Sequence, residues 1–413
     1  MMPSASPLRV ATLAHGHPTQ SAGGAEIAAQ TLHRALADHE NITALHIACA
    51  PYGVIAPAGA DEMFVETADL DDFRLVRRDP SEHQRLVAML REFDPDVIHL
   101  HHVLGFGSDL IFALRRGFPR AVLVLTLHEY IPICHNRGQM VTPDGELCTE
   151  ASPRACSRCF PDYAPGQFQG RAAALRALLS MADAFVAPSA FLASRYVQWG
   201  LPASRIHLVE NALPDRLASP PREDRPRRRG RFAFFCQINP YKGLDLLLEA
   251  IALVAPGAWE GCSLAVHGSG LERQPPPFRA RLDDLLKATG DRVTLLGPYR
   301  NSEVAALMSE ADWLVVPSIW WENSPVVIQE AFASNLPVIA ANLGGMAEKV
   351  RDGIDGMLFH ARDPHDLARV LVDASNPQRW EQSRKAIKPP LSARTAAEIH
   401  VALYRALLAN CAS

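Results

Sequence analysis

The 413-residue sequence has few cysteines, no long hydrophobic run and almost no excess of charge. Its 41 basic residues nearly balance 45 acidic ones, and the net charge of −4 argues against a general nucleic-acid-binding protein. Its clean apolar runs, such as residues 121–127, are far too short to span a bilayer. The first six residues lack the charged and apolar regions of a secretory signal, so we expect a cytoplasmic protein.

Eight cysteines are too few for a disulfide framework at this length, so most are expected to be reduced core residues or metal ligands. With 48% hydrophobic and 21% charged residues, the chain has the composition of a globular protein. Its length predicts two domains.

Short apolar runs alternate with amphipathic segments of helix length, which predicts parallel, doubly wound α/β sheets in both halves. The predicted strands are residues 8–14, 44–48, 97–101, 121–127, 184–187, 232–236, 263–267, 293–296, 313–316 and 337–340. The predicted helices are residues 25–38, 81–92, 244–254, 301–309 and 325–334.

Two Rossmann-like domains are predicted, over residues 1–212 and 232–390. Residues 213–231 between them are rich in proline and arginine and lack apolar periodicity, which is typical of a linker. We expect this linker to be solvated, and contact with acidic lipid headgroups is the alternative. Residues 391–413 have a helical pattern.

Residues 313–331 read as a buried strand, a turn carrying Glu322, and a helix with Ser324 as its cap and Pro325 as its first residue. Backbone N–H groups and the dipole at such a helix start favour a phosphate. Glu322 and Glu330 flank that position, where they can accept hydrogen bonds from hydroxyl groups on either side. A nucleotide sugar has hydroxyls on both sides of its diphosphate; a capped, solvated helix start is the alternative.

This segment resembles the donor-site motif of the retaining GT-B glycosyltransferases of family 4 (glycosyl transferases group 1). In that motif, two glutamates separated by seven residues are followed by alanine and a second strand, here residues 336–340. The resemblance implies two Rossmann-like domains facing across a cleft, with the last helix crossing back to the N-terminal domain. It also implies that Glu322 lies by the transferred sugar and that Glu330 binds the ribose hydroxyls. The other expected donor-binding residues of this segment are Asn323, Ser324, Pro325 and Val326.

Residues 236–243 resemble the family segment in which an arginine and a lysine five residues apart hold the donor diphosphate. Lys242 matches the lysine, but Gln237 stands where most members have arginine, so one positive charge is missing. Gly268 follows another strand, where glycine allows close backbone approach to a ligand or simply makes a turn. Tyr299 matches a segment beside the base, where it either stacks on the base or covers the loop.

In the first half, Gly23 and Gly24 open a helix and resemble a family loop near the diphosphate and acceptor; a simple strand-to-helix turn is the alternative. His128 ends a predicted strand and matches a family histidine that reaches the sugar. A histidine satisfied within the fold is the alternative. His101 and His102 follow another strand and are weaker candidates for the same cleft.

Four cysteines cluster in a proposed loop insertion over residues 134–160, and the last two have the C-x-x-C spacing of a metal knuckle. A structural zinc site is predicted, and an iron–sulfur cluster would use the same ligands. A reduced loop or a disulfide is the alternative. The predicted ligands are Cys134, Cys148, Cys156 and Cys159.

The sequence thus predicts a glycosyltransferase (EC 2.4) that moves a sugar from a nucleoside-diphosphate sugar to a glycan or lipid-linked acceptor with retention, in polysaccharide or cell-surface glycan assembly. His128 and Glu322 would orient the sugar, and Lys242 would stabilise the departing diphosphate without a catalytic cofactor. No nucleic-acid partner is expected, and peripheral contact with the inner face of the membrane is compatible with the family. The alternatives are a GT-B epimerase or phosphorylase, and a catalytically silent nucleotide- or glycan-binding subunit, which Gln237 motivates.

Overall fold

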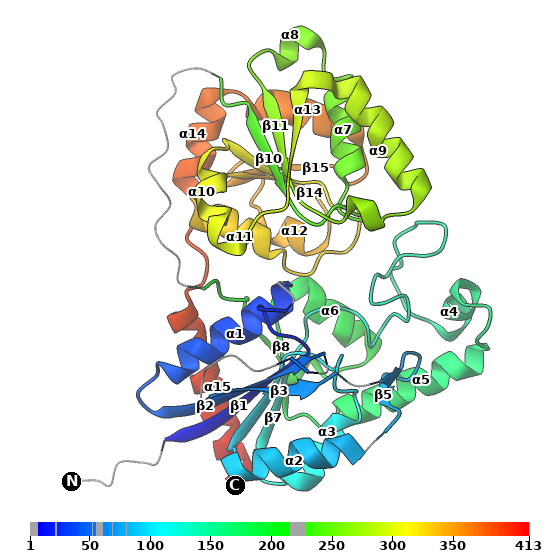
Figure 1. The fold of residues 1–413 in the computed structure, drawn as a ribbon, viewed down its shortest axis with the longest axis vertical. Coiled ribbons are helices and arrows are strands. Elements are labelled where there is room, and N and C mark those ends of the chain that lie inside the picture. Colours follow the sequence, from blue (N-terminus) through cyan, green and yellow to red (C-terminus); the bar gives the residue numbers. More distant parts are fainter. Residues whose placement is uncertain are drawn as a thin grey trace. The chain divides into compact units, whose positions relative to one another are not determined.

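The computed structural model describes residues 7–20, 23–51, 53–54, 61–67, 69–79, 81–214 and 228–412. The chain forms two compact units, which Figure 1 shows as two α/β assemblies. Unit 1 comprises Met1–Asp215 together with Leu391–Ser413, and unit 2 comprises Arg216–Pro390. Most of the predicted linker, residues 215–227, lies outside the described residues.

Unit 1 is built on a seven-stranded parallel sheet with the order β3-β2-β1-β6-β7-β8-β9. Its strands are β1 (Leu8–Ala14), β2 (Ile42–Ala50), β3 (Glu62–Glu66), β6 (Val97–Leu100), β7 (Val122–Thr126), β8 (Ala184–Ala187) and β9 (Ile206–Leu208). A separate antiparallel pair is formed by β4 (Leu70–Asp71) and β5 (Val76–Arg77). Its helices are α1 (Gly24–Ala37), α2 (Ser81–Phe93), α3 (Leu110–Gly117), α4 (Pro153–Cys159), α5 (Pro165–Leu179), α6 (Ala190–Trp199), the short η1 (Ala203–Arg205) and α15 (Ala393–Ala412).

Unit 2 has a six-stranded parallel sheet with the order β12-β11-β10-β13-β14-β15. Its strands are β10 (Arg231–Phe235), β11 (Ser263–His267), β12 (Val293–Gly297), β13 (Trp313–Val316), β14 (Val338–Ala341) and β15 (Gly356–Phe359). Its helices are α7 (Leu244–Leu253), α8 (Pro256–Trp259), α9 (Pro276–Thr289), α10 (Val304–Ser309), α11 (Val326–Ala333), α12 (Gly344–Lys349), α13 (Pro364–Ala374) and α14 (Pro377–Ala386), with short turns η2 (Leu271–Arg273), η3 (Gly290–Arg292) and η4 (Asn301–Glu303).

Both sheets reverse their strand order at one point, which fixes where a ligand can enter. In unit 1 the reversal lies between β1 and β6, and in unit 2 it lies between β10 and β13. Neighbouring connections leave such a point in opposite directions, and the crevice beyond the carboxyl ends of the strands is where α/β sheets bind ligands. The predicted fold class, two doubly wound α/β domains, is confirmed.

The last helix, α15, completes the core of unit 1. Val401 and Tyr404 are fully or almost fully buried in the same hydrophobic cluster as Val10 of β1 and Leu32 of α1. The Tyr404 hydroxyl lies 2.6 Å from Nδ1 of His99, in the middle of β6. Among the described residues, no helix is long and apolar enough to cross a membrane.

Candidate functional site

In unit 2, a lysine and a glutamate meet beyond the strands that flank the reversal of the sheet. Lys242 follows β10 and Glu322 follows β13, and their Nζ and Oε1 atoms lie 2.6 Å apart. The same Oε1 atom accepts hydrogen bonds from the Ser318 hydroxyl at 2.8 Å and from the Trp320 indole at 2.9 Å. Three donors on one oxygen fix the orientation of the Glu322 carboxylate. Glu322 as a whole is only 6% exposed.

Lys242 keeps its positive charge at this position. Burial alone would lower its pKa, but the neighbouring Cys236 and the Glu322 carboxylate raise the pKa above that of an ordinary lysine. Its ammonium also lies 5.4 Å from the centre of the Trp320 ring. A permanent cation beyond the strand ends is what a departing diphosphate requires.

The helix after β13 begins one residue later than predicted. Pro325 is the N-cap of α11, which starts at Val326, and no side chain caps it. Pro325 has φ of −61° and ψ of 111°, an extended conformation, so helical geometry begins only after it. The Ser324 hydroxyl is buried and has no hydrogen-bond partner among the described residues, and the Ser324 N–H bonds to the Asn323 side chain. This hydroxyl and the first N–H groups of α11 are free to bind an anion.

Three glycines bring backbone segments close together around this site. A Cβ atom on Gly345 would lie 1.8 Å from the Asn323 carbonyl oxygen, and the Gly345 N–H donates to the Glu322 carbonyl at 2.7 Å. A Cβ on Gly243 would lie 2.0 Å from the carbonyl oxygen of Pro317, and one on Gly268 would lie 2.2 Å from that of Cys236. These loops therefore pack at distances that exclude any side chain.

The other predicted donor-site residues of unit 2 lie in segments that follow strands of this sheet. Glu330 is buried in α11, and Gln237 is exposed two residues after the end of β10. Tyr299, which follows β12, meets the Phe235 ring edge-on at 5.4 Å, and that ring in turn stacks on His267 at 4.3 Å. The Tyr299 ring therefore packs at the ends of β10 and β11.

In unit 1, His128 is buried next to a second histidine. Its Nε2 atom lies 3.2 Å from Nδ1 of His101, and the two rings are stacked with centres 5.4 Å apart. Burial lowers the pKa of His128 to about 3 and that of His101 well below the ordinary value, so both rings are neutral. One ring must therefore donate and the other accept, which couples their tautomers.

Two histidine–glutamate contacts lie close to this pair. Nε2 of His102 lies 3.1 Å from Oε1 of Glu129, and Nε2 of His15 lies 3.5 Å from Oε1 of Glu26. The His15 and His102 rings are 4.4 Å apart. The loops after β1, β6 and β7 thus bring polar side chains together at the reversal of the unit 1 sheet.

The predicted glycines Gly23 and Gly24 lie at the start of α1. Gly23 is the N-cap and Gly24 is the first helical residue. The buried carboxylate of Glu26 folds back over Gly23, where a Cβ atom would lie 2.4 Å from its Oε2.

Four residues that contact the predicted site residues were not predicted from the sequence. They are Glu26, Glu129, Ser318 and Trp320. Of these four, only Ser318 and Trp320 could have been found from the sequence, because they lie in the turn just before Glu322.

The predicted zinc or iron–sulfur site is not supported. All four cysteines are reduced, and burial together with the three neighbouring thiols raises the pKa of Cys156 to about 11. Although these thiols influence one another, no three His, Cys, Asp or Glu side chains within the described ranges converge on a point that could hold a metal ion. The prediction relied on the C-x-x-C spacing, which sets only the separation of two cysteines along the chain.

Comparison with known families gives one match in each unit. A family model described as Glycosyltransferase Family 4 matches residues 22–216, and one described as Glycosyl transferases group 1 matches residues 229–376. Together the two models cover most of the chain.

Among curated proteins, the chain resembles several called D-inositol 3-phosphate glycosyltransferase. It is 36% identical to that of Salinispora tropica over 166 residues, which are 37% of this chain and 33% of the relative. It is 30% identical to that of Thermobifida fusca over 252 residues, which are 57% of this chain and 58% of the relative. The chain thus spans only about a third of the length of the first of these relatives.

Among solved structures, sucrose-phosphate synthase from Thermosynechococcus elongatus has a TM-score of 0.71 at 20% identity, covering 98% of this chain and all of that one. HepE of Anabaena, in complex with UDP and glucose, has a TM-score of 0.63 at 16% identity, covering 96% of this chain and 99% of that one. These similarities show the fold. With both units matched by glycosyltransferase models, the chain belongs to the family 4 glycosyltransferases of GT-B fold.

Proposed function

We propose that the protein transfers a sugar from a nucleoside-diphosphate sugar to an acceptor hydroxyl, with retention of configuration at the anomeric carbon. The observation that carries the proposal is the contact between Lys242 and Glu322 beside the start of α11. It combines a permanent cation, unpaired N–H groups and a fixed carboxylate at the reversal point of the sheet.

The proposed reaction uses these groups to stabilise the leaving group. The bond between the anomeric carbon and the diphosphate oxygen breaks, and a bond from the acceptor oxygen to the same face forms. The acceptor proton passes to the departing phosphate. Lys242, the Ser324 hydroxyl and the α11 N–H groups stabilise the charge that develops on the diphosphate, while Glu322 and His128 orient the sugar.

The donor assignment is supported by the ligands of similar structures, since HepE was solved with UDP and with UDP-glucose. In this proposal Glu330 binds the ribose and Tyr299 lies by the base. The physiological setting that we propose is the assembly of a polysaccharide or cell-surface glycan on the cytoplasmic side of the membrane.

A second candidate is a silent subunit that binds a nucleotide but transfers no sugar. Gln237, which lies where the family resemblance predicts arginine, favours it because an amide supplies a hydrogen bond but no charge. Acceptor-dependent release of nucleoside diphosphate that disappears in Glu322→Ala would exclude this candidate.

Thermal unfolding with UDP, GDP, ADP and dTDP tests the donor site directly. A ligand that binds only the folded state stabilises it by RT ln(1 + [L]/Kd), about 2.7 kcal/mol at a hundredfold excess over Kd. We expect one nucleotide to raise the unfolding temperature of the wild type and to have little effect on Glu330→Ala. If none of the four has an effect, the proposed donor site is wrong.

A further inference from the structure

The contact between His101 and His128 can hold its hydrogen in two ways, and the surroundings of the two rings favour one of them. Burial lowers the pKa of both rings far enough to keep them neutral, so each ring carries one proton, on Nδ1 or on Nε2. Nδ1 of His101 lies 3.2 Å from Nε2 of His128, and one hydrogen lies between these atoms. Either His101 donates it from Nδ1, or His128 donates it from Nε2.

The two arrangements differ in what they leave at Nε2 of His101. This atom is buried and has no hydrogen-bond partner among the described residues. If His128 donates, the proton of His101 must lie on this atom, which buries an N–H group without an acceptor. If His101 donates, the same atom is an unprotonated acceptor. A buried N–H group without a partner is rarer than a buried acceptor without one, so donation from His101 is favoured.

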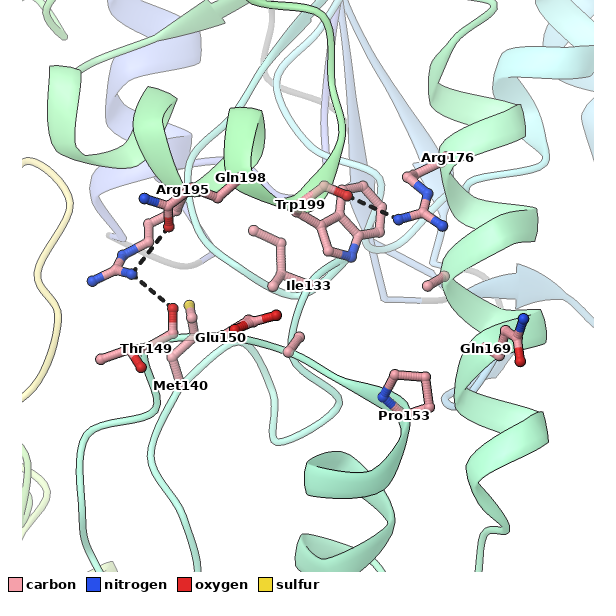
Figure 2. Close-up of a pocket in the computed structure, with 12 residues that line it drawn as sticks. Ile133, Met140, Thr149, Glu150, Pro153, Gln169, Arg176, Arg195, Gln198 and Trp199 are labelled. Carbon is pink, nitrogen blue, oxygen red and sulfur yellow. Dashed lines mark hydrogen bonds between the residues drawn. The ribbon is translucent and has the colours of Figure 1, made fainter.

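Neither of two cavities in unit 1 supplies Nε2 of His101 with a partner. The larger cavity, of about 230 Å³, lies between the segment from Ile133 to Pro153 and helices α5 and α6, and neither histidine lines it (Figure 2). The smaller cavity, of about 20 Å³, has room for one water molecule and is lined by His101. Nε2 of His101 is nevertheless closed to solvent. The proton of His101 therefore belongs on Nδ1.

The free nitrogen of the other ring has different surroundings. Nδ1 of His128 also has no hydrogen-bond partner among the described residues but, unlike Nε2 of His101, it is accessible to solvent. Because Nε2 of His128 accepts the hydrogen bond from His101, the proton of His128 must lie on Nδ1. The ring then presents an N–H group to a ligand, and its one accepting nitrogen is already occupied.

We propose that His101 is a positioning residue that holds His128 in its Nδ1–H tautomer, so that His128 meets the transferred sugar as a hydrogen-bond donor. In this state His128 does not act as the base for the acceptor hydroxyl, because its Nε2 lone pair is taken. That proton passes to the departing phosphate, as in the proposed reaction. The contact with the sugar rests on the proposed function, whereas the tautomer does not.

Nuclear magnetic resonance of the wild type with isotopically labelled histidine rings tests the tautomer without any substrate, because protonated and unprotonated ring nitrogens have different chemical shifts. We expect the proton of His128 on Nδ1, and that of His101 also on Nδ1. His102 is an internal reference for the opposite tautomer, since the Leu104 N–H donates to its Nδ1 at 2.9 Å and its Nε2 lies 3.1 Å from Glu129. A proton on Nε2 of His128 would overturn the proposal.

Two variants of His101 test the positioning role through the transfer reaction. His101→Leu cannot donate a hydrogen bond to His128, so we expect it to lower kcat at least about tenfold with little change in KM for the donor. His101→Asn has nearly the same size as the leucine variant but retains an N–H donor, and it should keep most of the wild-type kcat. The matched control is His33→Leu, which removes a histidine of α1 that is only 1% exposed and should change neither kcat nor the His128 signals.

The outcomes separate this proposal from the proposed function. A folded His101→Leu protein with wild-type kcat and unchanged His128 signals would overturn the positioning role. If this variant does not fold, the spectrum of the wild type decides, because it reads the tautomer directly. If the tautomer is as expected but no nucleotide sugar supports transfer, the proposed function fails while the assignment of the tautomer stands.

Discussion

Lys242 and Glu322 are 80 positions apart in the chain, yet the ammonium of one lies 2.6 Å from the carboxylate of the other. Strands β10 and β13 are neighbours in the sheet, so the loops that follow them meet at its edge. The pair links the group that would stabilise the leaving diphosphate to the one that would orient the sugar.

Replacing Lys242 with methionine is expected to lower the transfer rate by roughly 10²–10³-fold, because loss of one preorganised charge-stabilising group costs about that much. The measurement is acceptor-dependent release of nucleoside diphosphate. The matched control is Arg281→Gln, which breaks exposed ion pairs with Asp245 and Glu249 in the same unit. A Lys242→Met enzyme that retains more than a tenth of wild-type activity would contradict the assigned role.

Gly345→Ala is expected to weaken nucleotide binding and to lower the free energy of unfolding by about 1–3 kcal/mol, since its methyl group would overlap the Asn323 carbonyl. Urea unfolding and nucleotide titration are the measurements. Gly257→Ala is the control, because no atom lies within 4 Å of a Cβ atom at that position. Equal stability of the two variants would show that the Gly345 contact is not restrictive.

Tyr404→Phe is expected to cost about 1–3 kcal/mol of unfolding free energy, because it leaves Nδ1 of the buried His99 without its partner. Urea unfolding measures this loss. Ile399→Ala, on the exposed side of the same helix, should change stability much less. If both variants are as stable as the wild type, the hydrogen bond contributes nothing to the docking of α15.

Stability is expected to fall as the pH drops below about 6.5. Burial lowers the pKa of His15 to about 2, of His128 to about 3 and of His400 to about 4 in the folded protein, while the unfolded chain titrates near 6.5. As the pH falls, the unfolded state therefore binds protons before the folded state does. Each of these histidines lowers the free energy of unfolding by up to about 1.4 kcal/mol per pH unit below 6.5, until the pH reaches its pKa in the folded protein.

Urea unfolding at pH 7.5, 6.0 and 5.0 checks this pH dependence. His128→Gln should make the loss of stability with falling pH shallower, because one titrating group is removed. The exposed His365, replaced by glutamine, is the control. An unchanged slope in His128→Gln would indicate that this ring does not stay neutral in the fold.

The central strands could be predicted from sequence because they are continuous apolar runs buried on both faces, as in β7 and β13. Of the four edge strands, β12 was predicted, whereas β3, β9 and β15 were missed. β9 has only three residues and Leu208 is 60% exposed, while β3 contains only half-buried and exposed residues. Such short, partly solvated strands carry too little apolar signal to stand out from loops.

The candidate site, like the fold, could be predicted only in part from the sequence. Lys242 and Glu322 were proposed from a motif, but nothing in the sequence indicated that one oxygen would accept three hydrogen bonds. The His101–His128 and His102–Glu129 contacts depend on β6 pairing with β7, which spacing along the chain does not reveal. The zinc prediction is not supported for a related reason: the four thiols lie close enough to influence one another, but within the described ranges no three ligand side chains converge on one point.

The packing of α15 into unit 1 imposes an order on biosynthesis. Val401 and Tyr404 fill a cluster that also contains residues of β1 and α1, so the first domain to leave the ribosome lacks part of its interior until the whole of the second has been translated. The nascent chain must hold that apolar gap open to solvent or to a chaperone throughout synthesis of unit 2. Premature termination within unit 2 would therefore leave both units damaged.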